Sequence, residues 1–185
     1  MAIAWSNSWA AGMFRRADAA EYKLCLRLNR GCDVPRVRTV FAIVSRAGDG
    51  IFWYTLMLFL PLMYGSAGLY PALRMAAVGS VGLGLYKYLK ACLVRERPYI
   101  TLAGVVAGTK VLDRYSFPSG HTLHAVSFTI LACYSFPQLA WLCVPFATLV
   151  AASRVVLGLH YPSDVLAGAA LGAGLAVSAL WLVPV

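Results

Sequence analysis

Four residues near the end of the sequence have side chains suited to phosphoryl transfer. Ser153, Arg154, His160 and Asp164 lie in the short run SRVVLGLHYPSD. An arginine offers two parallel N–H groups to phosphate oxygens. A histidine is a competent nucleophile toward phosphorus when its other ring nitrogen donates to a carboxylate, which fixes the tautomer. Asp164 is close enough in sequence to reach back to His160, and Arg154 is suited to hold the phosphate.

A second block, Pro118-Ser119-Gly120-His121, opens an apolar stretch. Ser119 is suited to cap a helix, and Gly120 lets the backbone approach a ligand closely. The free N–H groups of a helix N-terminus, together with the helix dipole, attract anions. His121 would stand there as a proton donor. The competing interpretation is a capped helix start with a surface histidine, and His124, one turn further on, is interpreted as a packing residue.

A third block, KACLVRERP, places Lys90 and Arg97 seven residues apart, just before Pro98. Seven residues make two helical turns, so both cations can project from one face. The competing interpretation is that these long side chains extend to the membrane surface, as is common at the ends of apolar helices. Lys87 and Arg95 are better candidates for that role.

Composition places the chain among membrane proteins. It has 185 residues, of which 61% are hydrophobic and 12% are charged, and its mean hydropathy is +0.72. These values are typical of a helical membrane protein rather than of a soluble domain. The net charge of +9 comes from lysines and arginines clustered at the ends of apolar stretches. Anionic headgroups and phosphate substrates are therefore the expected partners, and nucleic acid is not.

Five apolar stretches approach the length of ~20 residues that a bilayer crossing needs. They cover about 51–70, 72–94, 120–136, 139–159 and 163–183. The predicted fold is an all-α polytopic membrane helix bundle with about five transmembrane helices. Because successive crossings alternate in direction, all three polar blocks are expected at the same membrane face. A GxxxG pattern at Gly168 and Gly172 is expected to pack closely against another helix of the same chain rather than to form a dimer face.

Residues 1–50 differ from the rest. Eight basic residues interrupt short apolar patches there, so no crossing fits. The run AAEYKLCLRLNR places Leu24, Leu28 and Cys25 toward one side of a helix, which suits an amphipathic helix in the headgroup plane. Two segments are therefore predicted, a basic amphipathic interfacial segment over 1–50 and a transmembrane domain over 51–185 that carries the three polar blocks. Residues 98–117 form the only long loop.

Together the three blocks resemble the type-2 phosphatidic acid phosphatase (PAP2) superfamily, whose pattern reads KxxxxxxRP, then PSGH, then SRxxxxxHxxxD. All three parts match without a gap. The resemblance implies that His160 forms a phosphohistidine, that Asp164 orients it, and that His121 protonates the leaving oxygen. It also implies that phosphate oxygens are held by five residues: Lys90, Arg97, Arg154, Ser119 and Gly120. No metal or cofactor is implied, and two histidines and one aspartate beside three cations make a poor cation cage.

The leading hypothesis is an integral-membrane phosphatase that removes a terminal phosphate from an anionic lipid. The candidate substrates are undecaprenyl pyrophosphate or another polyprenyl phosphate, phosphatidylglycerol phosphate, and phosphatidate. The alternative is a lipid-binding or lipid-transport protein that keeps a phosphate pocket without turnover. The expected location is the bacterial inner membrane. Of the 16 lysines and arginines, all but Arg74 lie on the expected site side, which favours a cytoplasmic site.

Overall fold

The computed structural model describes residues 8–111 and 113–182, and this part of the chain is all-helical, with one isolated bridge between Glu96 and Tyr115. The all-α class is thus confirmed. The elements are α1 Ser8–Asn29, η1 Arg30–Asp33, α2 Pro35–Arg46, η2 Ala47–Ile51, α3 Phe52–Tyr64, α4 Ser66–Cys92, α5 Pro98–Thr101, α6 Gly120–Ser135, η3 Pro137–Leu139, α7 Ala140–Val156 and α8 Pro162–Leu182.

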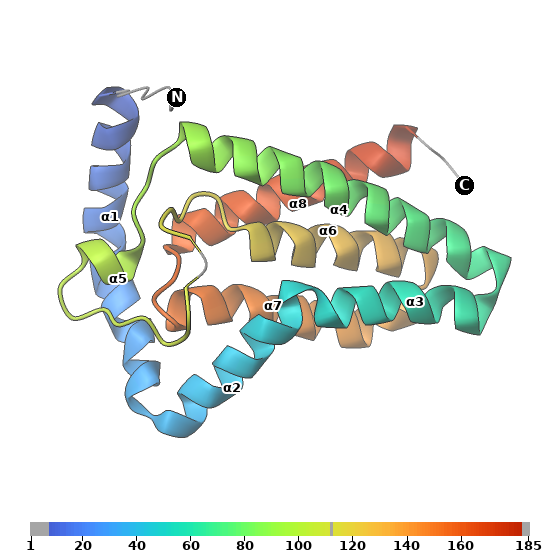
Figure 1. The fold of residues 1–185 in the computed structure, drawn as a ribbon, viewed down its shortest axis with the longest axis horizontal. Coiled ribbons are helices and arrows are strands. Elements are labelled where there is room, and N and C mark those ends of the chain that lie inside the picture. The colour runs from blue at the N-terminus through green and yellow to red at the C-terminus, as the bar shows by residue number, and fades with distance from the viewer. Residues whose placement is uncertain (1–7, 112, 183–185) are drawn as a thin grey trace.

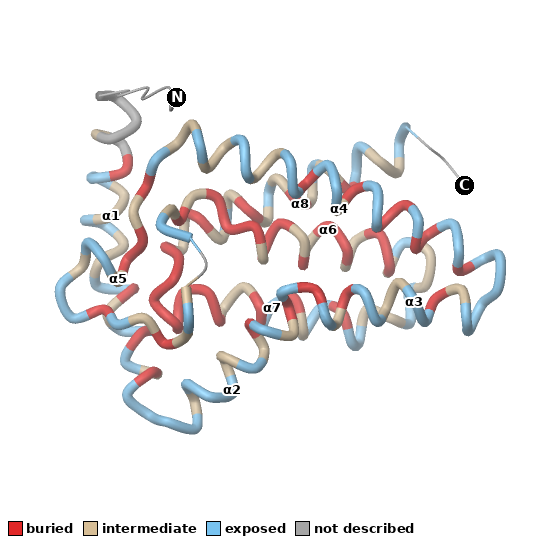
Figure 2. The backbone as a smooth tube through the Cα atoms, in the orientation of Figure 1, coloured by how far each residue is buried: buried red, intermediate tan, exposed pale blue. Residues whose placement is uncertain are grey.

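Helices α3, α4, α6, α7 and α8 run side by side as a bundle, and α1 lies across one end of it (Figure 1). Figure 2 shows the buried residues concentrated on the inward sides of this bundle. The core contains Trp53, Leu60, Met75, Phe128 and Val150, which come from α3, α4, α6 and α7. The same end of the bundle holds the C-termini of α4 and α7 and the N-termini of α6 and α8, and it faces α1 and α5.

Two helical stretches, Pro137–Val156 and Pro162–Leu182, are long and apolar enough to cross a membrane. They correspond to the fourth and fifth predicted crossings. The other three crossings and the interfacial placement of residues 1–50 stay predictions. Residues 1–7, Leu112 in the long loop and Val183 at the end of the fifth predicted crossing lie outside the described residues.

The boundary between the first two apolar stretches differs from the prediction. Helix α3 ends at Tyr64 and α4 begins at Ser66, so the first stretch ends earlier than residue 70. Gly65 makes this turn possible because its φ is +57°. A Cβ at Gly68 would lie 2.0 Å from the carbonyl oxygen of Leu60, so only glycine allows the two helices to approach this closely. Pro71 is accommodated inside α4.

The glycine pair of α8 packs against α6, as predicted. A Cβ at Gly168 would lie 2.4 Å from the carbonyl oxygen of Ser119. A Cβ at Gly172 would lie 2.3 Å from that of Leu123. The backbone N–H of Ser119 also donates to the carbonyl oxygen of Asp164 at 3.1 Å. These contacts fix the start of α8 beside the start of α6, and so place the third sequence block next to the second.

Residues before Ile51 contact the bundle directly. In α1, Cys25 is buried, while Leu24 and Leu28 are exposed. The side-chain nitrogen of Asn29 donates to the carbonyl oxygens of Val106 and Val156, in both cases at 2.9 Å. The predicted division at residue 50 therefore separates segments that are packed together in the structure.

Candidate active site

The three polar blocks meet around one cavity of about 900 Å³. Lys90 comes from the last turn of α4, Arg97 from the segment before α5, His121 from the first turn of α6, Arg154 from the last turn of α7, and His160 from the loop after it. Helix ends that are far apart in the sequence thus bring these side chains to the same end of the bundle.

His160 is positioned by the sharp end of α7. Gly158 has a φ of +69°, and a Cβ there would lie 2.5 Å from the carbonyl oxygen of Val106. A glycine just beyond a helix end can adopt this left-handed conformation. The N–H groups of Leu159 and His160 both donate to the carbonyl oxygen of Arg154, at 3.0 Å. The turn therefore fixes the backbone of His160 close to that of Arg154.

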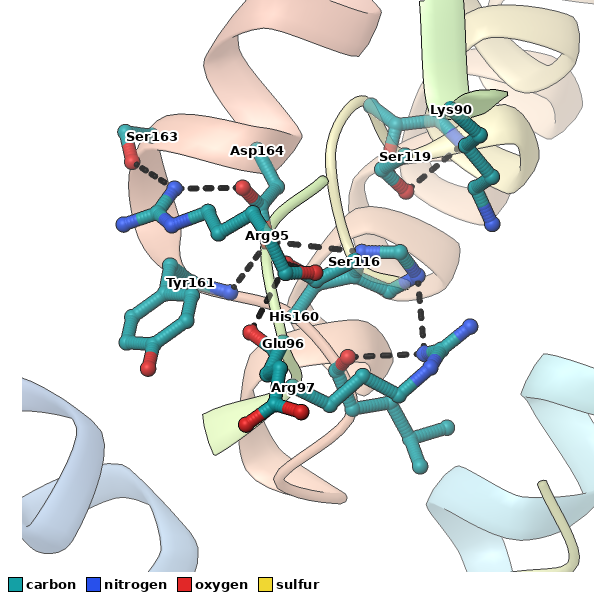
Figure 3. A network of polar contacts seen from close by, with 12 residues as sticks. Lys90, Arg95, Glu96, Arg97, Ser116, Ser119, His160, Tyr161, Ser163 and Asp164 are labelled. Carbon is teal, nitrogen blue, oxygen red and sulfur yellow. Dashed lines mark hydrogen bonds and ion pairs between the residues drawn. The ribbon is translucent and has the colours of Figure 1, made fainter. Parts of the chain in front are cut away.

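The two ring nitrogens of His160 have different surroundings (Figure 3). Nδ1 lies 3.6 Å from Oδ2 of Asp164, which is longer than a hydrogen bond. Nε2 lies 3.3 Å from Nη1 of Arg97. The imidazole is 1% exposed, and burial, followed by the charges of Arg154, Arg97 and Lys90, holds its pKa well below 6.5. Its neutral form is therefore favoured, which leaves a ring nitrogen free to act as a nucleophile.

Asp164 is fully buried and strongly held. Its Oδ2 accepts a hydrogen bond from the N–H of Tyr161 at 2.9 Å. Its Oδ1 accepts one from Nη1 of Arg95 at 2.5 Å. The prediction that Arg95 extends to the membrane surface was wrong, because this side chain is 2% exposed and lies 3.8 Å over the ring of Tyr161. The ion pair with Asp164 therefore holds the guanidinium of Arg95 inside the fold.

Arg95 also links the site to α1. Its Nε and Nη2 donate to Oδ1 of Asp18 at 3.0 and 2.6 Å, and its Nη2 lies 3.6 Å from Glu21. Burial raises the pKa of Asp18, with the Arg95 guanidinium opposing that rise. The signal in the sequence was a pair of acids, Asp18 and Glu21, three positions apart and so about one helical turn, but their partner was not evident from the pattern.

Lys90 and Arg97 share a third carboxylate. Asp113, in the loop before α6, accepts a hydrogen bond from Nζ of Lys90 at 2.8 Å and from Nη2 of Arg97 at 2.5 Å. Burial opposes ionisation of Asp113, but these two cations hold its pKa below the ordinary value. The Asp113 carboxylate thus occupies a position in which Lys90 and Arg97 could otherwise contact an anionic ligand.

Arg154 keeps part of its hydrogen-bonding capacity unused. Its Nη1 donates to Oγ of Ser45 in α2. Its buried Nε, like the buried Nδ1 of His160, has no hydrogen-bond partner within residues 8–111 and 113–182. Unpaired donors of a buried guanidinium are costly unless a ligand completes them. An anion that accepts from Arg154 would satisfy this site.

The residues of the PSGH block have different roles. Gly120 and His121 line the cavity, and a Cβ at Gly120 would lie 3.2 Å from the ring of Tyr86. Ser119 is fully buried, and its Oγ caps α6 by accepting from the N–H of Thr122 at 3.4 Å. It does not line the cavity. Nε2 of His124 donates to the carbonyl oxygen of Gly79 at 3.1 Å, and its ring stacks on Phe128, in keeping with a packing role.

Comparison with known proteins identifies the class that this fold and site define. Residues 67–185 match the PAP2 superfamily, so the chain belongs to that family. It is 36% identical over 91 residues to the bacitracin transport permease protein BcrC of Bacillus licheniformis, which covers 48% of this chain and 43% of that relative. The match therefore spans less than half the length of this curated relative.

Two solved structures share the fold. LpxE of Aquifex aeolicus has a TM-score of 0.76 at 22% identity, covering 88% of this chain and 95% of that one. A transmembrane PAP2-type phosphatidylglycerolphosphate phosphatase of Bacillus subtilis has a TM-score of 0.67 at 22% identity, covering 95% and 94%. These likenesses extend the shared architecture beyond residue 67 toward the N-terminal helices.

Proposed function

We propose that the protein is an integral-membrane phosphatase that hydrolyses the terminal phosphate of an anionic lipid. The observation that carries this proposal is the single cavity in which His160 lies beside Arg97 and Arg154. In this proposal Lys90, Arg97 and Arg154 neutralise the phosphoryl oxygens, with the Gly120 amide as a further donor. Ser119 contributes by capping α6 and holding that amide in place.

The reaction would run in two steps. Since Nδ1 of His160 faces Asp164, Nε2 is the nitrogen that attacks phosphorus, and the bond from phosphorus to the lipid oxygen breaks as the P–N bond forms. His121 gives its proton to the departing lipid oxygen. His121 then accepts a proton from a water that attacks the phosphohistidine, which releases inorganic phosphate and restores His160. The 3.6 Å separation of His160 and Asp164 would shorten as positive charge develops on the ring.

The apolar part of the cavity lining is consistent with a lipid substrate. Besides its cationic end, the cavity is lined by Trp53, Met57 and Phe128. A phosphate bound between the cations would therefore have an apolar surface beside it for the first part of a hydrocarbon chain. Three kinds of lipid have the required combination of phosphate and apolar chain. They are the polyprenyl phosphates (among them undecaprenyl pyrophosphate), phosphatidylglycerol phosphate and phosphatidate.

The outer surface supports a place in the bilayer. Large apolar side chains are exposed along the bundle, among them Leu58, Leu62 and Leu166. Trp141, in the first turn of α7, and Trp181, in the last turn of α8, are 90% and 83% exposed. The cavity residues in or next to these two helices are at or beside their other ends. Aromatic side chains of this kind favour the membrane interface. We further infer that the cavity faces the cytoplasm, because nearly all lysines and arginines lie at its end of the bundle.

The proposal is tested by phosphate release from detergent-solubilised lipids in excess chelator. The wild-type protein should release phosphate, and His160→Ala should abolish release. Lys90→Met should lower the rate, whereas Lys87→Met, an exposed cation on the same helix, should not. Lipid binding without release would favour the alternative of a transport or binding protein, and the BcrC relative is named as a transport permease. Release by His160→Ala would contradict the proposal that His160 is the nucleophile.

Sidedness needs an introduced cysteine. Cys25 and Cys32 are 2% and 8% exposed, so they would label poorly on either side of a membrane. Arg36 is exposed near the start of α2. Arg36→Cys should resist a membrane-impermeant thiol reagent in intact cells and react after lysis, and labelling in intact cells would place the cavity on the outer face.

A further inference from the structure

The chain bends between α2 and α3 in an unusual way. The short segment η2 joins the two helices, and the chain kinks within it at Gly50, whose φ is +140°. A Cβ at Gly48 would lie 2.8 Å from Val150, so the turn packs tightly on α7. This turn precedes residues 67–185, the part of the chain that matches the family.

Two side chains of this bend reach residues assigned to the reaction. Ser45 is buried, and its Oγ accepts a hydrogen bond from Nη1 of Arg154. Asp49, four residues later, contacts Nε2 of His121 through its Oδ1. Both Ser45 and Asp49 line the cavity. The end of α2 and the turn that follows it therefore contact a phosphate-binding cation and the proton donor.

His121 needs such a partner because of its other neighbours. Arg154 from α7 and Lys90 from α4 act on it as positive charges, and neither Asp113 nor Asp164 contacts it. Burial, and then these positive neighbours, disfavour a protonated imidazole, yet a general acid must hold its proton until the leaving oxygen departs. Asp49 is the carboxylate in contact with the ring. It stays ionised: burial opposes this, but His121, Arg154 and Arg46 hold the pKa of Asp49 below its ordinary value.

We propose that Asp49 is a positioning residue for the reaction, which orients His121 and keeps its proton in place for the leaving oxygen. The inference rests on the proposed function. His160 and Asp164 then serve the attack on phosphorus, and His121 and Asp49 serve the departure of the lipid. Asp49 keeps its charge throughout and faces Nε2 of His121. The proton on the other ring nitrogen, Nδ1, passes to the lipid oxygen as the P–O bond breaks and is replaced from the attacking water.

Leaving-group dependence tests this role, because a good leaving group departs without a proton. The two probes are dodecyl phosphate, whose alkoxide leaves poorly, and 4-nitrophenyl phosphate, whose phenolate leaves well. Asp49→Asn should lower kcat for dodecyl phosphate about 100-fold and change KM little. The rate of phosphohistidine formation from 4-nitrophenyl phosphate, read as the first burst of nitrophenolate, should fall by less than about fivefold on the same grounds.

Further variants separate this role from a structural one. Asp49→Glu should recover part of the rate with dodecyl phosphate. His121→Ala should show the same leaving-group dependence, and adding Asp49→Asn to it should cost no more. Asp33→Asn, the same change at an exposed aspartate of η1, should behave as wild type. Equal losses on both probes, an effect confined to KM, or additive losses with His121→Ala would overturn the assignment.

The two proposals fail in distinguishable ways. If His160→Ala keeps the wild-type rates on both probes, the proposed function is wrong. If His160→Ala is inactive but Asp49→Asn does not discriminate between the probes, the phosphatase stands and only the role of Asp49 falls.

Discussion

Arg95 and Asp164 form a buried ion pair, with Nη1 2.5 Å from Oδ1, on the side of the carboxylate turned away from His160. The same arginine is held by Asp18 of α1. Asp164, which supports the proposed nucleophile His160, is therefore held by Arg95, and Arg95 is in turn held by α1, at the other end of the sequence.

Removing Arg95 should destabilise the protein. Arg95→Leu leaves Asp164 buried without its charge partner, and such losses cost about 3–5 kcal/mol. The expected result is a lower unfolding temperature in detergent and loss of phosphate release. Arg114→Gln, which breaks an exposed pair with Glu96, is the matched control and should leave the unfolding temperature unchanged. Normal stability of Arg95→Leu would mean that Asp164 is not charged in the fold.

Asp113 should compete with the substrate phosphate. It bridges Lys90 and Arg97, so an incoming anion must displace it. Because the Asp113 side chain is 46% exposed, the competition is screened by water. Asp113→Asn should tighten inhibition by vanadate about threefold, as measured by the inhibition constant, on the scale of a partly exposed ion pair. Weaker inhibition would instead assign Asp113 to holding the two cations in position.

His160 should make stability depend on pH. In the unfolded chain its imidazole takes up a proton near pH 6.5, but in the fold its pKa lies well below that value, because of burial and then of Arg154 and Arg97. As pH falls below about 6.5, only the unfolded state gains this proton, so the folded state loses stability, by up to about 1.4 kcal/mol per pH unit. His160→Gln should reduce the decline in unfolding temperature between pH 7 and 5. An unchanged decline would contradict the lowered pKa.

The contact between α8 and α6 should tolerate no added methyl group. Gly172→Ala would bring a Cβ against the carbonyl oxygen of Leu123, and overpacking of this kind costs about 1–3 kcal/mol. Because α8 carries Asp164 at its start, phosphate release should fall as well. Gly174→Ala is the control, since nothing lies within 4 Å of a Cβ at that position. Similar losses in both variants would show that general effects on α8, rather than this contact, are responsible.

The sequence predicted the helical class, and it predicted the grouping of Lys90, Arg97, His121, Arg154 and His160 because successive apolar stretches alternate in direction. A turn was also expected at Gly65-Ser66-Ala67-Gly68, but the first apolar stretch was extended past it to residue 70 because residues 51–70 are apolar on both sides of the turn. Periodicity cannot separate two helices that share one hydrophobic run. Whether three further stretches cross a membrane stays a prediction.

The supporting residues could not be predicted from their own surroundings. Arg95 looks like any basic residue at a helix end until Asp18, 77 positions earlier, is placed beside it. Asp49 carried one local signal, its position between Gly48 and Gly50, which marks a break in the helix. Its contact with His121 depends on how α3 and α6 pack, and that packing cannot be predicted from a short sequence motif.

The order in which the chain is made adds one consequence to the Arg95 network. Asp18 and Glu21 leave the ribosome first, Arg95 follows, and His160 and Asp164 emerge last. During translation the ion pair between Arg95 and Asp164 therefore cannot form until the start of α8 has been made.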